Sequence, residues 1–71
     1  MTPSEIDRQI LALAELDWRK VAAIIGHFAD DGTLDLAGDR IIALIEAGEL
    51  EVQGNPRLWR YSEIRLPQGS P

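Results

Sequence analysis

The 71-residue sequence predicts a mainly α-helical domain that ends in a β-hairpin, which is an α+β fold. Two patterns indicate it. Apolar residues recur at helical spacing in three segments between residues 3 and 47, and from residue 49 onward they alternate with polar residues, as in a strand. A chain of this length has room for one small core, so we predict one domain at residues 1–67 and a flexible tail at residues 68–71.

The first helix is predicted over residues 3–15. Thr2 can accept a hydrogen bond from the backbone N–H of Glu5. Pro3 lacks an N–H, which costs nothing in the first turn, where N–H groups have no partner within the helix. These residues therefore predict a helix start. The predicted buried stripe comprises Ile6, Ile10, Leu13 and Leu16. Leu11 projects roughly 140° away from Ile6 around the helix, so it is either exposed or covered by another surface.

The second helix is predicted to begin at Trp18 with Asp17 as its cap, and to end before a turn at residues 30–33, where Gly32 supplies a positive φ. Its buried face has the regular spacing of an amphipathic helix and comprises Val21, Ile24, Ile25 and Phe28. The opposite face comprises Arg19, Ala23, Gly26 and His27. The two small residues on that face would let another backbone approach closely.

The third helix is predicted over residues 35–47, followed by Gly48, the residue type that ends many helices. Its buried stripe comprises Ala37, Ile41, Leu44 and Ile45. The opposite side carries three acids and one isoleucine in a nearly straight row, which we call the acidic stripe: Asp35, Asp39, Ile42 and Glu46. Arg40 is the single basic residue beside it.

A hairpin is predicted from residue 49 onward. Leu50 and Val52 alternate with polar residues, residues 54–56 form a turn, and a return strand is predicted to begin at residues 58–61. Within this strand Trp59 and Tyr61 share one face, whereas the later apolar residues Ile64 and Leu66 are in phase with Leu58. We therefore expect a bulge or bend near residues 62–63.

Three helices followed directly by a hairpin is the order of elements in a winged-helix domain, the helix-turn-helix variant in which a two-stranded wing follows the third helix. We therefore predict a winged-helix-like fold with three helices and a two-stranded wing. A three-helix bundle with a loosely attached hairpin is the alternative arrangement.

Three segments also carry a family resemblance: LDWRKVA at residues 16–22, RIIALIEAGELEVQG at residues 40–54 and RYSEIRL at residues 60–66. They resemble an uncharacterised small bacterial domain of unknown function, which often follows a second uncharacterised domain in longer proteins. The resemblance covers roughly residues 5–67. It implies a winged-helix-like fold and supplies no catalytic residues.

The charges are distributed unevenly. Twelve acids and seven bases give a net charge of −5; residues 1–51 hold eleven acids and four bases, and residues 52–71 hold one acid and three bases. An acidic chain is a poor general ligand for nucleic acids or anionic membranes. Because no apolar run approaches about 20 residues and residues 1–5 do not resemble a signal peptide, we expect a cytoplasmic protein without membrane association.

Residue types that carry catalysis are scarce. The chain has no cysteine and one histidine, His27, and the local backbone explains Ser4 at a helix start and Ser62 at a strand bend. Residues 30–32 lack the alternating acids of a calcium loop. Because a nucleophile, a base and oxyanion donors are not all present, we predict no enzyme activity, cofactor, metal or small-molecule substrate.

The leading functional hypothesis is a noncatalytic protein-interaction module whose partner is another protein or a second copy of the chain. The acidic stripe suggests it, because the outward side of the third helix in a DNA-binding winged helix needs basic or amide side chains. Apolar residues predicted at outward or bordering positions strengthen it. The candidate interface residues are Leu11, Asp35, Asp39, Ile42 and Glu46.

The alternative hypothesis is a DNA-binding transcriptional regulator that contacts phosphates mainly through a basic wing. Its candidate residues are Arg19, Lys20, Arg40, Arg57 and Arg60. The net negative charge disfavours it, since duplex DNA carries one phosphate charge per about 1.7 Å. Phosphate contacts of this kind would fix the position of the protein and supply little sequence specificity.

Overall fold

The computed structural model describes residues 2–58 and 61–67. Within these ranges the fold is mixed α/β, with three helices and a three-stranded antiparallel sheet. The elements are α1 (Pro3–Leu13), β1 (Arg19–Lys20), α2 (Val21–Ile25) continued by the 3-10 helix η1 (Gly26–Asp31), α3 (Leu34–Glu46), β2 (Glu51–Gln53) and β3 (Glu63–Arg65). The predictions for Trp59, Arg60 and the tail at residues 68–71 lie outside the described residues.

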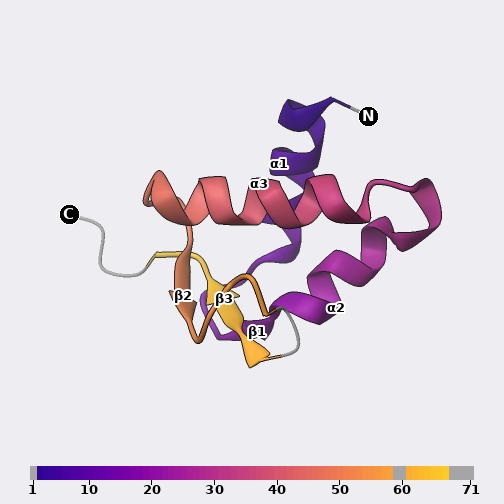
Figure 1. The fold of residues 1–71 in the computed structure, drawn as a ribbon. Helices are drawn as coiled ribbons and strands as arrows, with labels where there is room; N and C mark the ends of the chain where they lie inside the picture. The colour runs from indigo at the N-terminus through magenta and orange to yellow at the C-terminus, as the bar shows by residue number, and fades with distance from the viewer. Residues whose placement is uncertain (1, 59–60, 68–71) are drawn as a thin grey trace.

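The third helix, α3, runs across the molecule. In Figure 1, α1 crosses behind α3 at a steep angle, and α2 and the sheet lie below α3. The core lies between these elements and comprises Ile6, Ile10, Ala14, Val21, Ile24, Ile25, Phe28, Ala37, Ile41, Leu44, Leu50 and Ile64. Among the described helices, none is long and apolar enough to cross a membrane.

Helix α1 begins as predicted and ends two residues early. The Oγ1 atom of Thr2 accepts a hydrogen bond from the backbone N–H of Glu5 at 3.2 Å, which confirms the predicted cap. The chain becomes extended at Ala14, with φ −72° and ψ 149°. Leu16 therefore leaves the helical stripe, and its predicted burial is wrong: 57% of the residue is exposed.

The second helix begins at Val21, so the prediction of a start at Trp18 with Asp17 as the cap is wrong. Arg19 and Lys20 instead form β1, which pairs with β3. The backbone N–H of Val21 donates to the carbonyl of Ser62 at 3.1 Å, so the sheet occupies a donor in the first turn of the helix. The predicted buried face is confirmed, since Val21, Ile24, Ile25 and Phe28 are all in the core.

Helix α3 confirms the third prediction to within one residue at each end. Its end is set by Gly48, which has φ +80°. The N–H groups of Gly48 and Glu49 then donate to the carbonyls of Ile45 and Leu44 at 3.0 and 2.9 Å. These bonds satisfy carbonyls of the last turn and turn the chain into β2.

The sheet has three strands rather than the predicted two, because β1 joins the hairpin. The strand order is β1-β3-β2, and Val52 of β2 lies opposite Ile64 of β3. Strand β3 begins at Glu63, so the predicted start of the return strand is wrong at Leu58 and Tyr61, the two of its residues that the structure describes. Residues 54–58 and 61–62 are the described part of the connection from β2 to β3, and we call them the β2–β3 loop.

Candidate functional site

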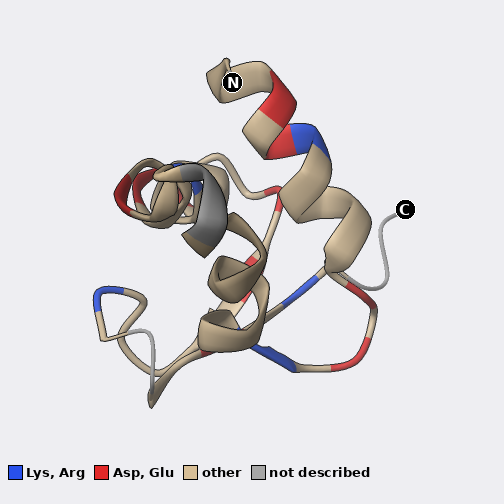
Figure 2. Cartoon of the chain, turned by 90° about the vertical axis from the view of Figure 1, so that its right-hand side faces the viewer, with Lys and Arg blue, Asp and Glu red and all other residues tan. Residues whose placement is uncertain are grey.

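The acidic stripe lies on the outward side of α3. Asp35, Asp39 and Glu46 are exposed and Ile42 is half-buried, whereas the neighbouring Ile41 is fully buried. Among the described residues, the three carboxylates form no ion pair. Figure 2 shows α3 nearly end-on, with acidic positions on the side turned away from α1. The structure thus assembles four predicted interface residues on one surface.

Arg40 does not neutralise this stripe, because it is bound to α1. Its Nε and Nη2 atoms donate to Oδ1 and Oδ2 of Asp7 at 2.7 and 2.8 Å, which is a bidentate ion pair. The hydrogen bonds from the guanidinium to the Asp7 carboxylate raise the pKa of Arg40 above its ordinary value, while desolvation opposes that shift. This candidate DNA contact therefore joins two helices.

Leu11 does not belong to the stripe. It is half-buried on α1 and packs against the core cluster, which agrees with the prediction that it is either exposed or covered. Leu11 and Ile42, the two apolar interface candidates, therefore have different surroundings, and only Ile42 lies among outward carboxylates.

The basic residues divide into paired and unpaired ones. Arg19 forms an ion pair with Glu15, and Arg65 donates to Glu51 at 2.6 Å while lying 4.3 Å from the centre of the Trp18 ring. Lys20 and Arg57 are exposed and, within the described part of the chain, form no ion pair. Arg60 lies outside the described residues. Two of the five predicted DNA contacts are therefore available cations.

The β2–β3 loop carries exposed apolar residues that the sequence analysis did not single out. Leu58 is 53% exposed and Tyr61 77% exposed, and Arg57 is exposed beside them. The prediction placed both residues in the return strand, with Tyr61 on the face of Trp59 and Leu58 in phase with Ile64 and Leu66. The signal for a longer loop was the Gly54-Asn55-Pro56 cluster, since such residues favour turns over strands.

The loop is held by local hydrogen bonds. The side chain of Asn55 accepts from the backbone N–H of Arg57 at 3.0 Å, and the N–H of Tyr61 donates to the carbonyl of Leu58 at 2.8 Å. Gly54 has φ +84°, and a Cβ atom there would overlap the carbonyl oxygen of Tyr61. The loop is therefore closed at a position that only glycine fits.

The acidic stripe and the β2–β3 loop face the same side of the molecule. In Figure 2 the loop and the outward side of α3 both lie at the edge opposite α1. In Figure 1 the same elements lie toward the viewer, and α1 lies behind them. One face of the molecule thus presents two groups of side chains: the carboxylates and the isoleucine of the acidic stripe, and the guanidinium and the apolar side chains of the β2–β3 loop.

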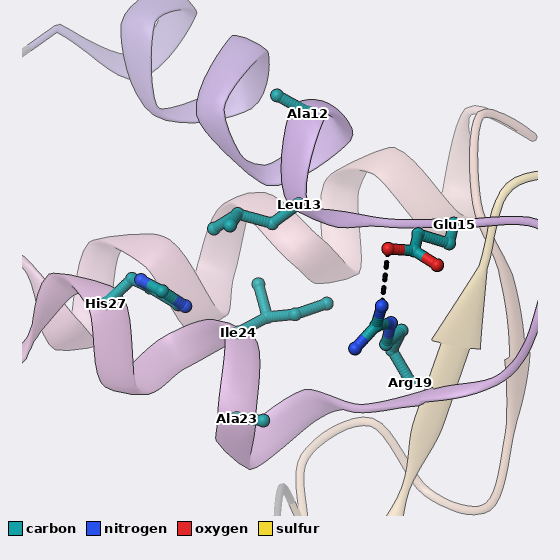
Figure 3. A pocket seen from close by; sticks show the side chains of 7 residues that line it. All are labelled: Ala12, Leu13, Glu15, Arg19, Ala23, Ile24 and His27. Carbon is teal, nitrogen blue, oxygen red and sulfur yellow. Dashed lines mark hydrogen bonds and ion pairs between the residues drawn. The ribbon is translucent and has the colours of Figure 1, made fainter.

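A small open groove of about 210 Å³ lies between the end of α1 and α2 (Figure 3). Ala12, Leu13, Ala23 and Ile24 line it, together with His27 and the Glu15–Arg19 ion pair. This volume is below the roughly 300 Å³ at which ligand pockets usually begin. No cluster of three or more metal-ligating side chains occurs in the described part of the chain.

A scan against protein-family models, a search of curated proteins and a search of solved structures found no match to this chain. The family resemblance carried by residues 16–22, 40–54 and 60–66 therefore stays a prediction.

Proposed function

We propose that this chain is a winged-helix-like, noncatalytic protein-interaction module that binds a polypeptide through the acidic stripe of α3. The succession helix, strand, helix, helix, strand, strand supports the fold assignment, with α3 as the third helix and β2, β3 and the loop between them as the wing. The same succession leaves the outward side of α3 as the surface that a partner would meet.

One observation carries the proposal. Three exposed carboxylates surround Ile42, and Arg40, the base beside them in the sequence, is held by Asp7. A surface of this kind suits a partner with Lys or Arg side chains around an apolar residue. The charges would speed association and exclude acidic partners, and burial of the isoleucine would contribute most of the hydrophobic contact.

The same surface opposes DNA. A recognition helix inserted in the major groove would bring Asp35, Asp39 and Glu46 toward a duplex with one phosphate charge per about 1.7 Å. Because Arg40 is engaged with Asp7, no unpaired base on α3 offsets that repulsion among the described residues. The charge arrangement therefore favours a protein partner.

Affinity capture from the source cells with matched variants tests this function. The wild-type chain, Ile42→Asp and Asp39→Lys would be immobilised in parallel with Asp17→Lys, which makes the same charge change in the segment between α1 and β1. We expect a protein retained by wild type and by Asp17→Lys and lost from both stripe variants. Retention that is equal on all four columns contradicts the proposal.

A second candidate function is phosphate binding by the β2–β3 loop, as in a DNA-binding regulator. It is favoured by the guanidinium of Arg57, which forms no ion pair with any described residue, and by the exposed ring of Tyr61, which could stack on a base. Mobility-shift assays at low salt separate the two functions. Salt-sensitive duplex binding that is lost in Arg57→Ala and Arg60→Ala would place this function first.

A further inference from the structure

We propose that the polypeptide bound by the acidic stripe is a second copy of this chain, whose β2–β3 loop docks on the stripe in a reciprocal, two-fold dimer. This inference rests on the proposed function and names its partner. It joins the unpaired carboxylates of α3 to the unpaired cation and exposed apolar residues of the loop.

The two surfaces are chemically complementary. The stripe offers the carboxylates of Asp35, Asp39 and Glu46 without ion-pair partners in the described structure, and the loop offers the guanidinium of Arg57, which is equally free. Arginine and carboxylate form the strongest common charged hydrogen bond. The apolar parts match too, since half-buried Ile42 would meet the exposed side chains of the loop.

Apolar exposure is concentrated in this loop. Of the three large hydrophobic residues that are exposed in the described structure, Leu58 and Tyr61 belong to it, and the third, Leu16, lies between α1 and β1. A chain with a core of this size leaves such residues in water only at a cost, which a second copy would remove.

The arrangement of the surfaces allows both contacts to form at once. Because the stripe and the loop face the same side of the molecule, a two-fold axis in front of that side brings each loop toward the stripe of the other copy. The hydrogen bonds of Asn55 and Tyr61 and the close approach at Gly54 hold the described residues of the loop before docking. A preorganised loop loses less conformational entropy on binding.

Sedimentation equilibrium over a concentration series tests the dimer with single charge reversals. Asp39→Lys changes the stripe and Arg57→Glu changes the loop, and each should weaken self-association by at least about tenfold. Asp17→Lys and Arg8→Glu make the same charge changes at exposed positions on the segment after α1 and on α1, and should leave it unchanged. Circular dichroism verifies that every variant is folded.

Mixing the two reversals is the decisive measurement. In an equimolar mixture of Asp39→Lys and Arg57→Glu, one contact of the reciprocal dimer pairs the two substituted side chains with opposite charges, and the other contact is unchanged. We expect the mixture to regain dimer that neither variant forms alone. A mixture that stays monomeric overturns the reciprocal interface.

The outcomes also separate this inference from the proposed function. A wild-type chain that is monomeric up to about 1 mM overturns self-association. In that case, loss of a captured protein in Asp39→Lys would still support binding by the stripe. A dimer that tolerates both charge reversals also overturns the inference, because its interface must then lie elsewhere.

Discussion

The two sides of α3 use similar residues for different purposes. Toward the core, Ile41 is fully buried, and Arg40 is bound by Asp7 of α1. Away from the core, Ile42 is half-buried and its acidic neighbours have no ion-pair partner in the described structure. One step along the helix, a rotation of about 100°, separates an isoleucine that stabilises the fold from one that is available for contact. The charged residues differ as well, because Arg40 is paired with Asp7 and the carboxylates of the outward side are not paired in the described structure. The two sides therefore differ in chemistry as well as in exposure.

The adjacent isoleucines test this contrast most strongly. Ile41→Ala should lower the free energy of unfolding by about 2–5 kcal/mol, because it opens a cavity in the core. Since cores of this size supply roughly 3–5 kcal/mol, that variant should be largely unfolded at 25 °C. Ile42→Ala should lose about 1 kcal/mol or less in the same urea titration. Equal losses would contradict the assignment of the two sides.

The β2–β3 loop, which faces the same side as the acidic stripe, contains one position where the fold requires glycine, and Gly54→Ala tests it. The substitution must adopt a positive φ and overlaps the carbonyl of Tyr61, whereas Gly48→Ala meets only the strain of its positive φ, about 1–2 kcal/mol. Thermal unfolding should therefore show a larger loss at Gly54 than at Gly48. A larger loss of stability in Gly48→Ala would mean that the β2–β3 loop can move to relieve the overlap between the new Cβ atom at position 54 and the carbonyl of Tyr61.

The ion pair on the α1 side gives a smaller effect. Arg40→Lys keeps the charge but cannot reproduce two parallel hydrogen bonds to Asp7, so the melting temperature should fall, by less than in Ile41→Ala. Arg8→Lys, at an exposed position that has no ion pair with another described residue, is the matched control and should not change the melting temperature. No difference between the two variants would show that the bidentate contact adds nothing to stability.

The smallest effect on stability is expected on the acidic stripe itself. Asp39→Asn removes a charge that forms no ion pair in the described part of the chain, so the free energy of unfolding should stay within about 0.5 kcal/mol of wild type. Chemical denaturation measures this directly. A loss well above that value would indicate that the carboxylate serves the fold and would weaken its assignment to a binding surface.

The elements predicted correctly are those with local signals. The cap at Thr2, the buried face from Val21 to Phe28 and the end of α3 at Gly48 each depend on residues within a few positions of one another. Strand β1 has no such signal, since its two residues become a strand only by pairing with β3, more than forty positions away. Leu16 was misplaced for a related reason, because helix α1 stops before reaching it.

The candidate site was predictable to a similar extent. Helical spacing alone placed the acidic stripe on the outward side of α3. Spacing could not show that Arg40 is occupied by Asp7, thirty-three positions earlier, or that Leu58 and Tyr61 are exposed in a loop. The ion pair depends on how α1 and α3 meet, and it shifts the balance of charges on α3 toward a protein partner. The loop had a local signal in Gly54, Asn55 and Pro56, which favour turns over strands.

The strand order has a consequence for how the chain folds during synthesis. Because β3 is the last of the described strands along the chain and the middle strand of the sheet, β1 and β2 have no common neighbour until Arg65 leaves the ribosome. The helices can form earlier, but Ile64, which completes the core, arrives after every other core residue. A nascent chain would therefore expose its unfinished core until Ile64 is available, and would then close it in one late step.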